Sequence, residues 1–161
     1  MLRPATPADA AAIAAIYNHY ILHTVVTFEE ETVPAEEMAQ RITATQADGN
    51  PWFVWDEGGR VLGYAYASKW KSRCSYRFSV EATVYLDKDA TRRGLGTKLY
   101  SAVIEACRNT KIHAIIGGVS LPNAGSVALH EKLGFKKVAH FPEVGWKFNQ
   151  WIDVGYWELI L

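Results

Sequence analysis

A short segment between an apolar run and an amphipathic run combines two glycines with two arginines, in the order Arg92-Arg93-Gly94-Leu95-Gly96-Thr97. Closely spaced glycines let the backbone turn tightly and present consecutive N–H groups, and the N-terminus of a helix is the positive end of its dipole. The arginines add fixed charge and bidentate donors. A plain strand–turn–helix connection would also use glycines, but the whole pattern favours a binding loop for phosphate oxygens.

Two familiar phosphate-binding patterns do not fit this segment. A P-loop requires G-x-x-x-x-G-K-[ST], which residues 94–98 do not supply. The dinucleotide pattern G-x-G-x-x-G requires a third glycine where Leu99 stands, and it opens a βαβ unit near the chain start, whereas this segment comes past the middle. The sequence therefore predicts a pyrophosphate ligand on a fold other than the Rossmann fold.

The composition predicts a single domain over residues 1–161, because 49% hydrophobic residues are enough for one full core. Lys+Arg and Asp+Glu both total 17, and zero net charge argues against nucleic-acid or anionic-membrane partners. Neither a leader peptide nor a membrane span is expected. Cys74 and Cys107 form no disulfide framework and no metal-ligand spacing, so we expect no metal and a reducing, cytoplasmic location.

Hydrophobic periodicity and turn residues predict an α/β fold, a mixed sheet with about four helices on its two faces. A first helix follows the capping-box-like residues 6–9 and carries an apolar stripe through Ile13 and Ile21. The other expected helices span residues 35–45, 97–109 and 124–133. The expected strands span residues 2–5, 52–55, 61–68, 80–86, 114–119, 135–140 and 151–161, with 80–86 at the centre.

This order of elements resembles the GNAT acetyltransferase superfamily along the whole chain. Within that superfamily it resembles the phosphinothricin acetyltransferase family, including relatives that acetylate methionine sulfoximine and sulfone. The matching words are Ile16-Tyr17-Asn18, Thr27-Phe28-Glu29, Trp70-Lys71-Ser72-Arg73, Thr83-Val84-Tyr85-Leu86, Asn123, Ser126, Leu129-His130 and Leu133-Gly134-Phe135. One departure is Thr91, where superfamily loops usually carry Gln or Arg.

The resemblance implies the GNAT fold, in which the middle strands of the mixed sheet splay apart, and it implies acetyl-CoA as cosubstrate. Residues 92–97 would then hold the pyrophosphate, while the backbone of Val84, Tyr85 and Leu86 would pair with the pantetheine arm. Asn123 would contact the same arm, although a plain helix N-cap explains it as well. An ordinary core strand likewise explains residues 84–86.

Glu81 and His130 are the candidate catalytic residues. Transfer to an amine needs a neutral nucleophile, and a carboxylate that takes the proton removes that limit. Glu81 interrupts an apolar strand, so either a salt-bridge partner or catalysis must explain it. His130 occupies the position where many superfamily members carry a tyrosine that protonates the departing thiolate, although a structural histidine is the alternative.

The resemblance also implies an amino-acid substrate whose acid groups need cations. Lys71 and Arg73 lie in the segment before the central strand and would clamp these groups. The full set expected at the substrate is Lys71, Ser72, Arg73, Glu81, Ala82, Thr83, Phe28 and Glu29.

The resulting hypothesis is direct acetyl transfer, in a ternary complex, to the α-amine of a phosphinothricin-, methionine sulfoximine- or methionine sulfone-like molecule, which would confer antibiotic or herbicide resistance. The alternatives are another amine (a protein N-terminus, a polyamine or an aminoglycoside) or a non-catalytic acetyl-CoA-binding protein. Family likeness further implies a homodimer that covers part of the aromatic-rich segment 141–157.

Overall fold

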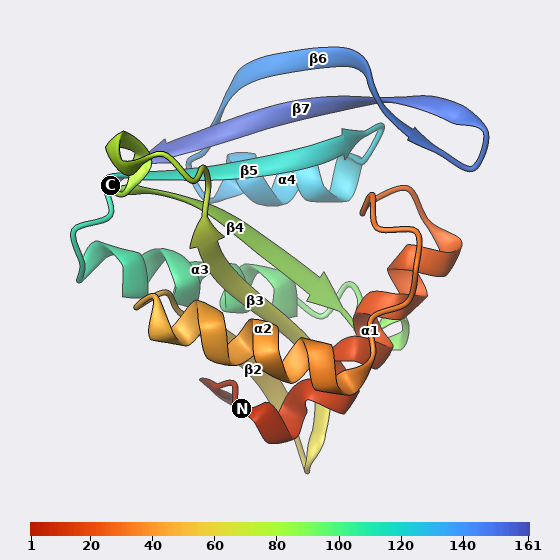
Figure 1. Ribbon diagram of the computed structural model, residues 1–161, viewed down its shortest axis with the longest axis vertical. Coiled ribbons are helices and arrows are strands. Elements are labelled where there is room, and N and C mark those ends of the chain that lie inside the picture. The colour runs from red at the N-terminus through yellow and green to blue at the C-terminus, as the bar shows by residue number, and fades with distance from the viewer.

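The computed structural model describes residues 1–161 and contains one seven-stranded mixed sheet in the order β1-β2-β3-β4-β5-β7-β6 (Figure 1). The strands are β1 (Leu2–Pro4), β2 (Trp52–Glu57), β3 (Arg60–Lys69), β4 (Ser79–Leu86), β5 (Ala114–Leu121), β6 (Lys136–Lys147) and β7 (Gln150–Ile160). The helices are α1 (Ala10–His23), α2 (Ala35–Ala47), α3 (Leu95–Arg108) and α4 (Ala124–Lys132). The predicted fold class and the central place of β4 are confirmed.

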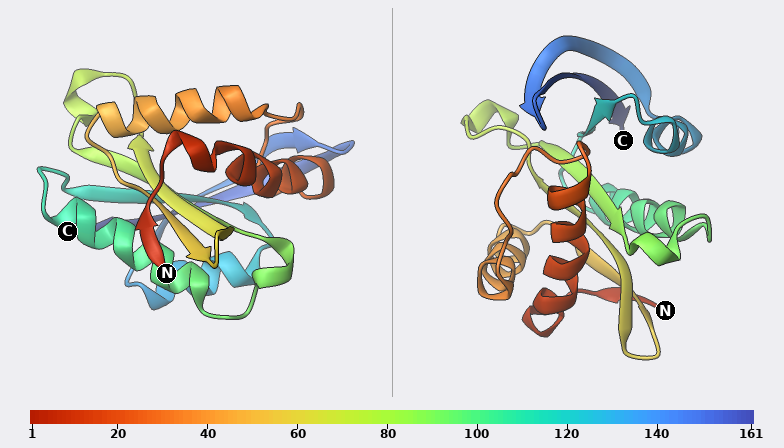
Figure 2. Two further views of the ribbon diagram at one scale, coloured as in Figure 1. Left: turned by 90° about the horizontal axis from the view of Figure 1, so that it is seen from below. Right: turned by 90° about the vertical axis from the view of Figure 1, so that its right-hand side faces the viewer.

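Helices cover both faces of the sheet. Figure 2 shows α1 and α2 on one face and α3 and α4 on the other. Each face has its own core: Ile13, Ile21 and Ile42 pack on the first, and Leu99 and Val103 on the second. None of these helices combines the length and the apolar character needed to cross a bilayer.

The central strands β4 and β5 separate along their length. β4 pairs with antiparallel β3 from Ser79 to Leu86, but its parallel pairing with β5 covers only Ser79–Glu81. Beyond Glu81, β5 stays paired with β7 while β4 follows β3, so the two strands form a wedge (Figure 1). The edge of β4 from Ala82 to Leu86 therefore has no strand partner on that side.

Most boundaries differ from the sequence expectation by one or two residues, and three of the differences have a clear structural cause. α3 begins at Leu95 instead of Thr97, because Gly94 adopts a left-handed N-cap conformation and Leu95 is already buried. Residues Pro7–Asp9 form a short 3₁₀ turn before α1. β6 continues to Lys147 through two register irregularities, since an edge strand tolerates both bulges and a proline.

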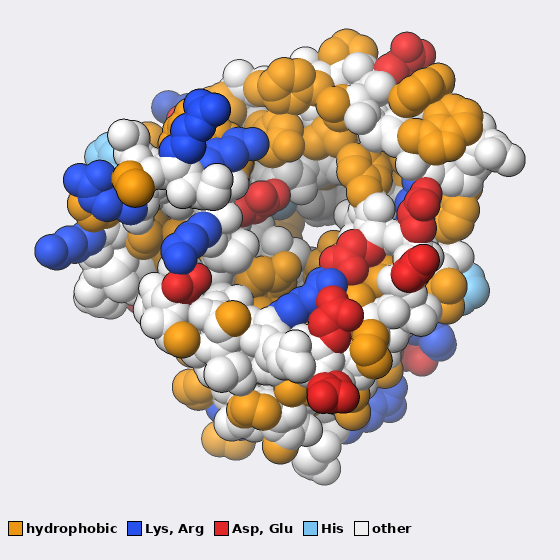
Figure 3. Space-filling model, viewed as in Figure 1, with side chains coloured by type: hydrophobic (Ala, Val, Ile, Leu, Met, Phe, Trp, Pro, Cys, Tyr) orange, Lys and Arg blue, Asp and Glu red, His pale blue; other side chains and the backbone are white.

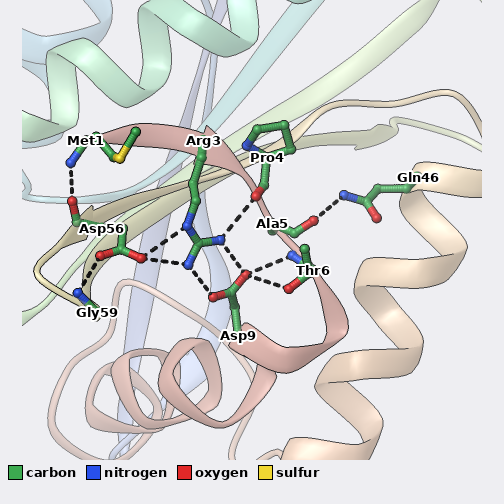
Figure 4. A network of polar contacts seen from close by, with 9 residues as sticks. All are labelled: Met1, Arg3, Pro4, Ala5, Thr6, Asp9, Gln46, Asp56 and Gly59. Atoms are coloured by element: carbon green, nitrogen blue, oxygen red, sulfur yellow. Dashed lines mark hydrogen bonds and ion pairs between the residues drawn. The ribbon is translucent and has the colours of Figure 1, made fainter.

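A charged network fixes the N-terminus far from the wedge (Figure 4). Arg3 donates to Asp9 and Asp56 at 2.7 and 2.8 Å, and these bonds hold the pKa of both carboxyl groups below the usual range. Gln46 of α2 donates to the carbonyl of Ala5 at 2.8 Å. The network joins β1, β2 and α2, and its role is structural.

Candidate active site

The wedge between β4 and β5 opens into a cavity of about 720 Å³. Figure 3 shows the hollow near the middle of the viewed face. Its wall is built by β4, the loop before α3, the end of β5, one side of α4, and residues of α1 and of the segment after it. Segments far apart in the sequence therefore meet at the point where the sheet splits.

One end of the cavity is lined by unused backbone donors. None of the amide N–H groups from Thr91 to Thr97 donates a hydrogen bond within the chain. Gly94 has φ +73°, which a glycine adopts without strain, and it turns these groups toward the cavity at the N-terminus of α3. Gly94, Gly96 and Thr97 all line the cavity. Converging amides at a helix N-terminus suit a pyrophosphate, so the residues fit the expected ligand.

The two arginines of this loop differ in placement. Arg92 lines the cavity, with φ +61°. Arg93 points elsewhere and forms an ion pair with Glu57 at 2.9 Å, while Leu95 is buried in a small core. The structure thus brings only one of the two expected arginine side chains to the cavity, because the other is committed to the β2–β3 hairpin.

The free edge of β4 forms one long wall. Val84, Tyr85 and Leu86 all line the cavity. Tyr20 of α1 also reaches this wall and donates to the carbonyl of Leu86 at 2.6 Å. Backbone groups on an unpaired edge are free to pair with an extended ligand that carries amides.

Glu81 lies where the two strands begin to separate, and its side chain faces the cavity without an ion-pair or hydrogen-bond partner in the chain. Burial raises the pKa of its carboxyl group, and the positive charge of Lys71 partly opposes that rise. On β5, Gly118 leaves room beside it, since a Cβ there would lie 3.2 Å from Oε1. A half-buried carboxylate with no partner is placed to accept a proton.

His130 is buried beside the cavity, and both of its ring nitrogens have partners. Nδ1 lies 2.7 Å from the carbonyl of Ser126, which only accepts, so Nδ1 carries the proton. Burial lowers the pKa of His130, and Nε2 of the neutral ring accepts from the hydroxyl of Tyr100 at 3.0 Å. That hydroxyl also lies 3.1 Å from the carbonyl of Ala82.

Asn123 forms the helix N-cap considered for it and also lies at the cavity. Its side-chain oxygen caps α4 by accepting from the amide of Ser126 at 3.1 Å, and the residue lines the cavity. The cap leaves the side-chain amide nitrogen unpaired.

The residues expected around the substrate divide into two groups. Ala82 and Thr83 line the cavity beside Glu81. The other five lie outside its lining: Lys71, Ser72, Arg73, Phe28 and Glu29. The first three belong to the exposed segment before β4.

Phe28 and Glu29 are engaged with other parts of the chain. Phe28 packs against Gly145 of β6, and a side chain at that glycine would collide with its ring. Glu29 binds Arg41 at 2.7 Å and accepts from Tyr17 at 2.9 Å, and the Arg41 contact lowers the pKa of Glu29. A paired carboxylate of this kind is a poor proton acceptor compared with Glu81.

Several cavity residues were missed by the sequence analysis. Tyr20, Tyr100, Thr27 and Gly118 all line the cavity, and none of them was expected there. The Gly117-Gly118 pair inside a buried strand was the available signal, since strand glycines often mark a close approach. No sequence signal distinguishes Tyr100 from its apolar neighbours on α3.

Three comparisons with known proteins agree with this geometry. Residues 2–155 match the family model described as an acetyltransferase (GNAT) domain. An L-methionine sulfoximine/L-methionine sulfone acetyltransferase of Salmonella typhimurium is 39% identical over 99% of this chain and 94% of its own. A phosphinothricin N-acetyltransferase of Streptomyces viridochromogenes is 38% identical over 98% and 85%. The crystal structure of a phosphinothricin acetyltransferase from Sinorhizobium meliloti in complex with acetyl-CoA superposes with a TM-score of 0.96 at 35% identity, covering 100% of this chain and 88% of that one.

Proposed function

This chain belongs to the GNAT acetyltransferase family, and we propose that it transfers acetyl from acetyl-CoA to the α-amino group of a small amino acid of the methionine sulfoximine, methionine sulfone or phosphinothricin type. The observation that carries the proposal is the unpartnered carboxylate of Glu81 where β4 and β5 diverge. The substrate class rests on the names of the relatives described above. Acetylation of such compounds would confer resistance to them.

The cavity walls supply the groups that would hold the cosubstrate. The amides of residues 91–97, with Arg92, would bind the pyrophosphate, and the free edge of β4 would pair with the pantetheine amides. The unpaired amide nitrogen of Asn123 adds a further donor. Acetyl-CoA supplies the acetyl group as a reactive thioester.

Glu81 would take the proton from the incoming ammonium, directly or through one water. The α-amino group of a peptide has a pKa near 8, so only about a tenth is free base at neutral pH, and the fraction is smaller for a free amino acid. The raised pKa of Glu81 brings it closer to that of the amine, and this makes proton transfer easier. The amide of Leu86 or of a neighbour would polarise the thioester carbonyl.

We assign Tyr100 and His130 to positioning. Burial raises the pKa of the tyrosine, which makes it a weak acid toward a thiolate, and the neutral ring of His130 spends its one proton on Ser126. The one proton of the Tyr100 hydroxyl is shared between Nε2 of His130 and the carbonyl of Ala82, so this hydroxyl links α3 to α4 and to β4 beside Glu81. In this proposal His130 does not act as the thiolate-protonating acid that the resemblance implied. The nitrogen–carbonyl bond forms as the carbon–sulfur bond breaks, and the departing coenzyme A thiolate takes the second proton of the attacking nitrogen, directly or through water.

Lys71 and Arg73 remain the proposed partners of the substrate's acid groups, with Ser72 between them. The charge of Lys71 already acts on Glu81. Lys71 and Arg73 are exposed and form no ion pair within the chain. The carboxylate of a bound amino acid would therefore contact these cations without displacing another partner.

Replacing Lys71 with Met is expected to shift the acid limb of the pH–rate profile to higher pH. The lysine charge lowers the pKa of Glu81, so its removal leaves burial alone and the base loses its proton later as pH rises. The KM for the amino acid should rise roughly tenfold, as for one exposed charged contact. Steady-state kinetics from about pH 5 to about pH 9 measure both effects. Lys69→Met, which removes an exposed lysine paired with Asp48, is the matched control. If Lys71→Met has the same pH profile as Lys69→Met, the role of Lys71 is refuted.

Thiol release from acetyl-CoA with a panel of amines tests the proposed function directly. The panel contains methionine sulfoximine, methionine sulfone, phosphinothricin, ordinary amino acids, a polyamine, an aminoglycoside and a peptide with a free N-terminus. Turnover confined to the amino acids supports the proposal. Turnover of the peptide or a polycation alone would show a different acceptor, and binding without any turnover would show a non-catalytic protein.

We further propose that residues 1–161 act as one acetyltransferase domain, supported by the single sheet that both cores share. A cytoplasmic location is proposed with it, supported by two free thiols at Cys74 and Cys107. A homodimer is proposed because the β6–β7 hairpin is apolar on its surface (Figure 3). Its exposed apolar side chains are Phe141, Val144, Trp146, Phe148 and Trp151.

Light scattering at micromolar concentration is expected to give twice the chain mass of 18.0 kDa. Phe148 and Asn149 occupy a turn with φ +51° and +56°, a conformation that suits Asn better than an aromatic residue. Phe148→Asn should therefore preserve the monomer fold while weakening the dimer, and Trp151→Ser should do the same. Leu22→Ser, another exposed apolar side chain on α1, serves as control. A wild-type mass of one chain would reject the dimer.

A further inference from the structure

Lys147 is a buried lysine that the proposed chemistry does not use. Its side chain is only 2% exposed, although it stands at the end of β6 next to the hairpin turn. Nζ donates to the carbonyl of Thr27 at 2.8 Å and lies over the ring of Phe148. No carboxylate lies within ion-pair distance, and burial lowers the pKa of this lysine. Burying an amine without an ion-pair partner costs free energy, and this cost indicates that the contact with Thr27 has a role.

The partner of Lys147 belongs to the wall of the cavity. Thr27 lies in the irregular segment 24–34 that joins α1 to α2, and both Val26 and Thr27 line the cavity. Val26 and Thr27 therefore border the same cavity as Glu81, whereas the loop before α3, with α3 and α4, lines the part expected to hold the pyrophosphate. Figure 1 shows the segment beside the turn end of the β6–β7 hairpin.

The segment is held from two directions. Helix α1, which precedes it, contributes Tyr17, whose hydroxyl lies 2.7 Å from the Thr27 hydroxyl, and Asn18, which forms two hydrogen bonds with the backbone of Val33. From the other half of the molecule comes one hydrogen bond, that of Lys147. The ring of Phe28 packs on Gly145 two residues away. The lysine therefore joins the two sides of the wedge.

We propose that Lys147 is a positioning residue for the acceptor side of the cavity, fixing Thr27 and the 24–34 segment against the β6–β7 hairpin so that the part of the cavity wall formed by Val26 and Thr27 is in place before the amino acid binds. The inference rests on the proposed acetyl transfer for its kinetic consequence. Without the lysine, the carbonyl of Thr27 loses its buried donor and must turn toward water to be satisfied. The segment would then sample positions in which the acceptor wall is incomplete, and the acceptor would bind less tightly.

Lys147→Met keeps the length and apolar stem of the side chain and removes the donor. We expect the KM for the amino acid to rise roughly tenfold to hundredfold, as for loss of a hydrogen bond from a charged donor. The dissociation constant of acetyl-CoA, measured by calorimetry, should stay within about twofold, because the phosphate loop and the β4 edge are untouched. Lys147→Arg, which retains a donor, should restore most of the acceptor affinity. Lys136→Met removes an exposed lysine from the same strand and should change nothing.

Hydrogen exchange of the 24–34 peptide supplies a test that does not depend on turnover. Its amides should exchange faster in Lys147→Met than in wild type, while peptides from α3 and α4 stay unchanged. Unchanged exchange together with an unchanged acceptor KM would overturn the inference. Equal losses for both substrates, with no rescue by arginine, would show a general stabilising role and overturn it as well. If wild type acetylates no amino acid, the proposed function fails, and the exchange result still decides whether Lys147 holds the segment.

Discussion

Replacing Glu81 with Gln is expected to lower kcat by roughly 10²–10⁴-fold, the range found when a general base is removed. Gln preserves the shape of the side chain and its capacity to hydrogen-bond, but it cannot take a proton. Glu81 is the carboxylate that lines the cavity, and it has no partner in the chain that would explain its burial. The acetyl-CoA affinity should change little, because the phosphate end lies along α3 and α4.

The pH dependence separates a catalytic Glu81 from a structural one. The raised pKa of Glu81 places the acid limb of the wild-type profile above the ordinary range of a glutamate. In Glu81→Gln this limb should instead follow the free amine, so that activity keeps rising with pH toward the pKa of the acceptor. Higher pH should therefore rescue part of the lost rate.

Stability should change in the opposite direction from activity. A carboxyl group whose pKa is raised in the folded state binds more protons folded than unfolded, so stability falls as pH rises through the interval between the two pKa values. The wild type carries this penalty as soon as Glu81 is ionised in the folded protein, and Glu81→Gln removes it. The variant should melt at a higher temperature than wild type at about pH 7. The difference should shrink as the pH falls toward about 4, the ordinary pKa of a glutamate.

Glu105→Gln, at an exposed position on α3, is the control for both measurements and should alter neither. Near-normal kcat with an unchanged profile in Glu81→Gln would show that the carboxylate is structural. The base would then have to be sought at other groups, although Glu29 is already paired with Arg41.

Local patterns were sufficient to predict the elements of this fold. The stripe through Ile13 and Ile21 marked the buried face of α1, and both side chains are fully buried. Turn residues at the strand ends separated the strands, and their order left few arrangements of the sheet. The boundary errors lie where tertiary contacts decide: Leu95 joins the helix because its side chain packs in a core, and β6 extends because β7 pairs with it.

The candidate site was predictable where backbone groups, and not side chains, form it. A glycine-rich turn before a helix makes unpaired amides whatever surrounds it, and the structure has them from Thr91 to Thr97. Side-chain directions were not predictable, since they depend on partners distant in sequence. Arg93 turns to Glu57, Tyr100 meets His130, and Lys147 reaches Thr27 across 120 residues. Sequence periodicity carries no information about such pairs.

Substitution of Gly96 is expected to separate cosubstrate affinity from fold stability. A Cβ at this position would lie 3.7 Å from Leu86 and 3.8 Å from Leu129, which are ordinary contacts, and its backbone is helical. The apoprotein can therefore accept Ala, and Ala should stabilise it slightly because glycine costs up to about 1 kcal/mol in a helix. The methyl group would project into the cavity at the place where the pyrophosphate must approach the amides.

Gly96→Val should accordingly weaken acetyl-CoA binding by roughly 100-fold or more, since a bulkier side chain holds the phosphates away from several charge-assisted hydrogen bonds. Gly96→Ala should show a smaller loss of acetyl-CoA affinity with an equal or higher melting temperature.

Gly94→Ala provides the contrast, because φ +73° strains any residue with a side chain while its Cβ would meet nothing within 4 Å. That variant should lose stability by about 1–2 kcal/mol. Calorimetric titration of acetyl-CoA into each folded variant, alongside melting curves, measures both quantities. Unchanged affinity in a folded Gly96→Val protein would mean that the pyrophosphate binds elsewhere, because no route to these amides avoids the added side chain.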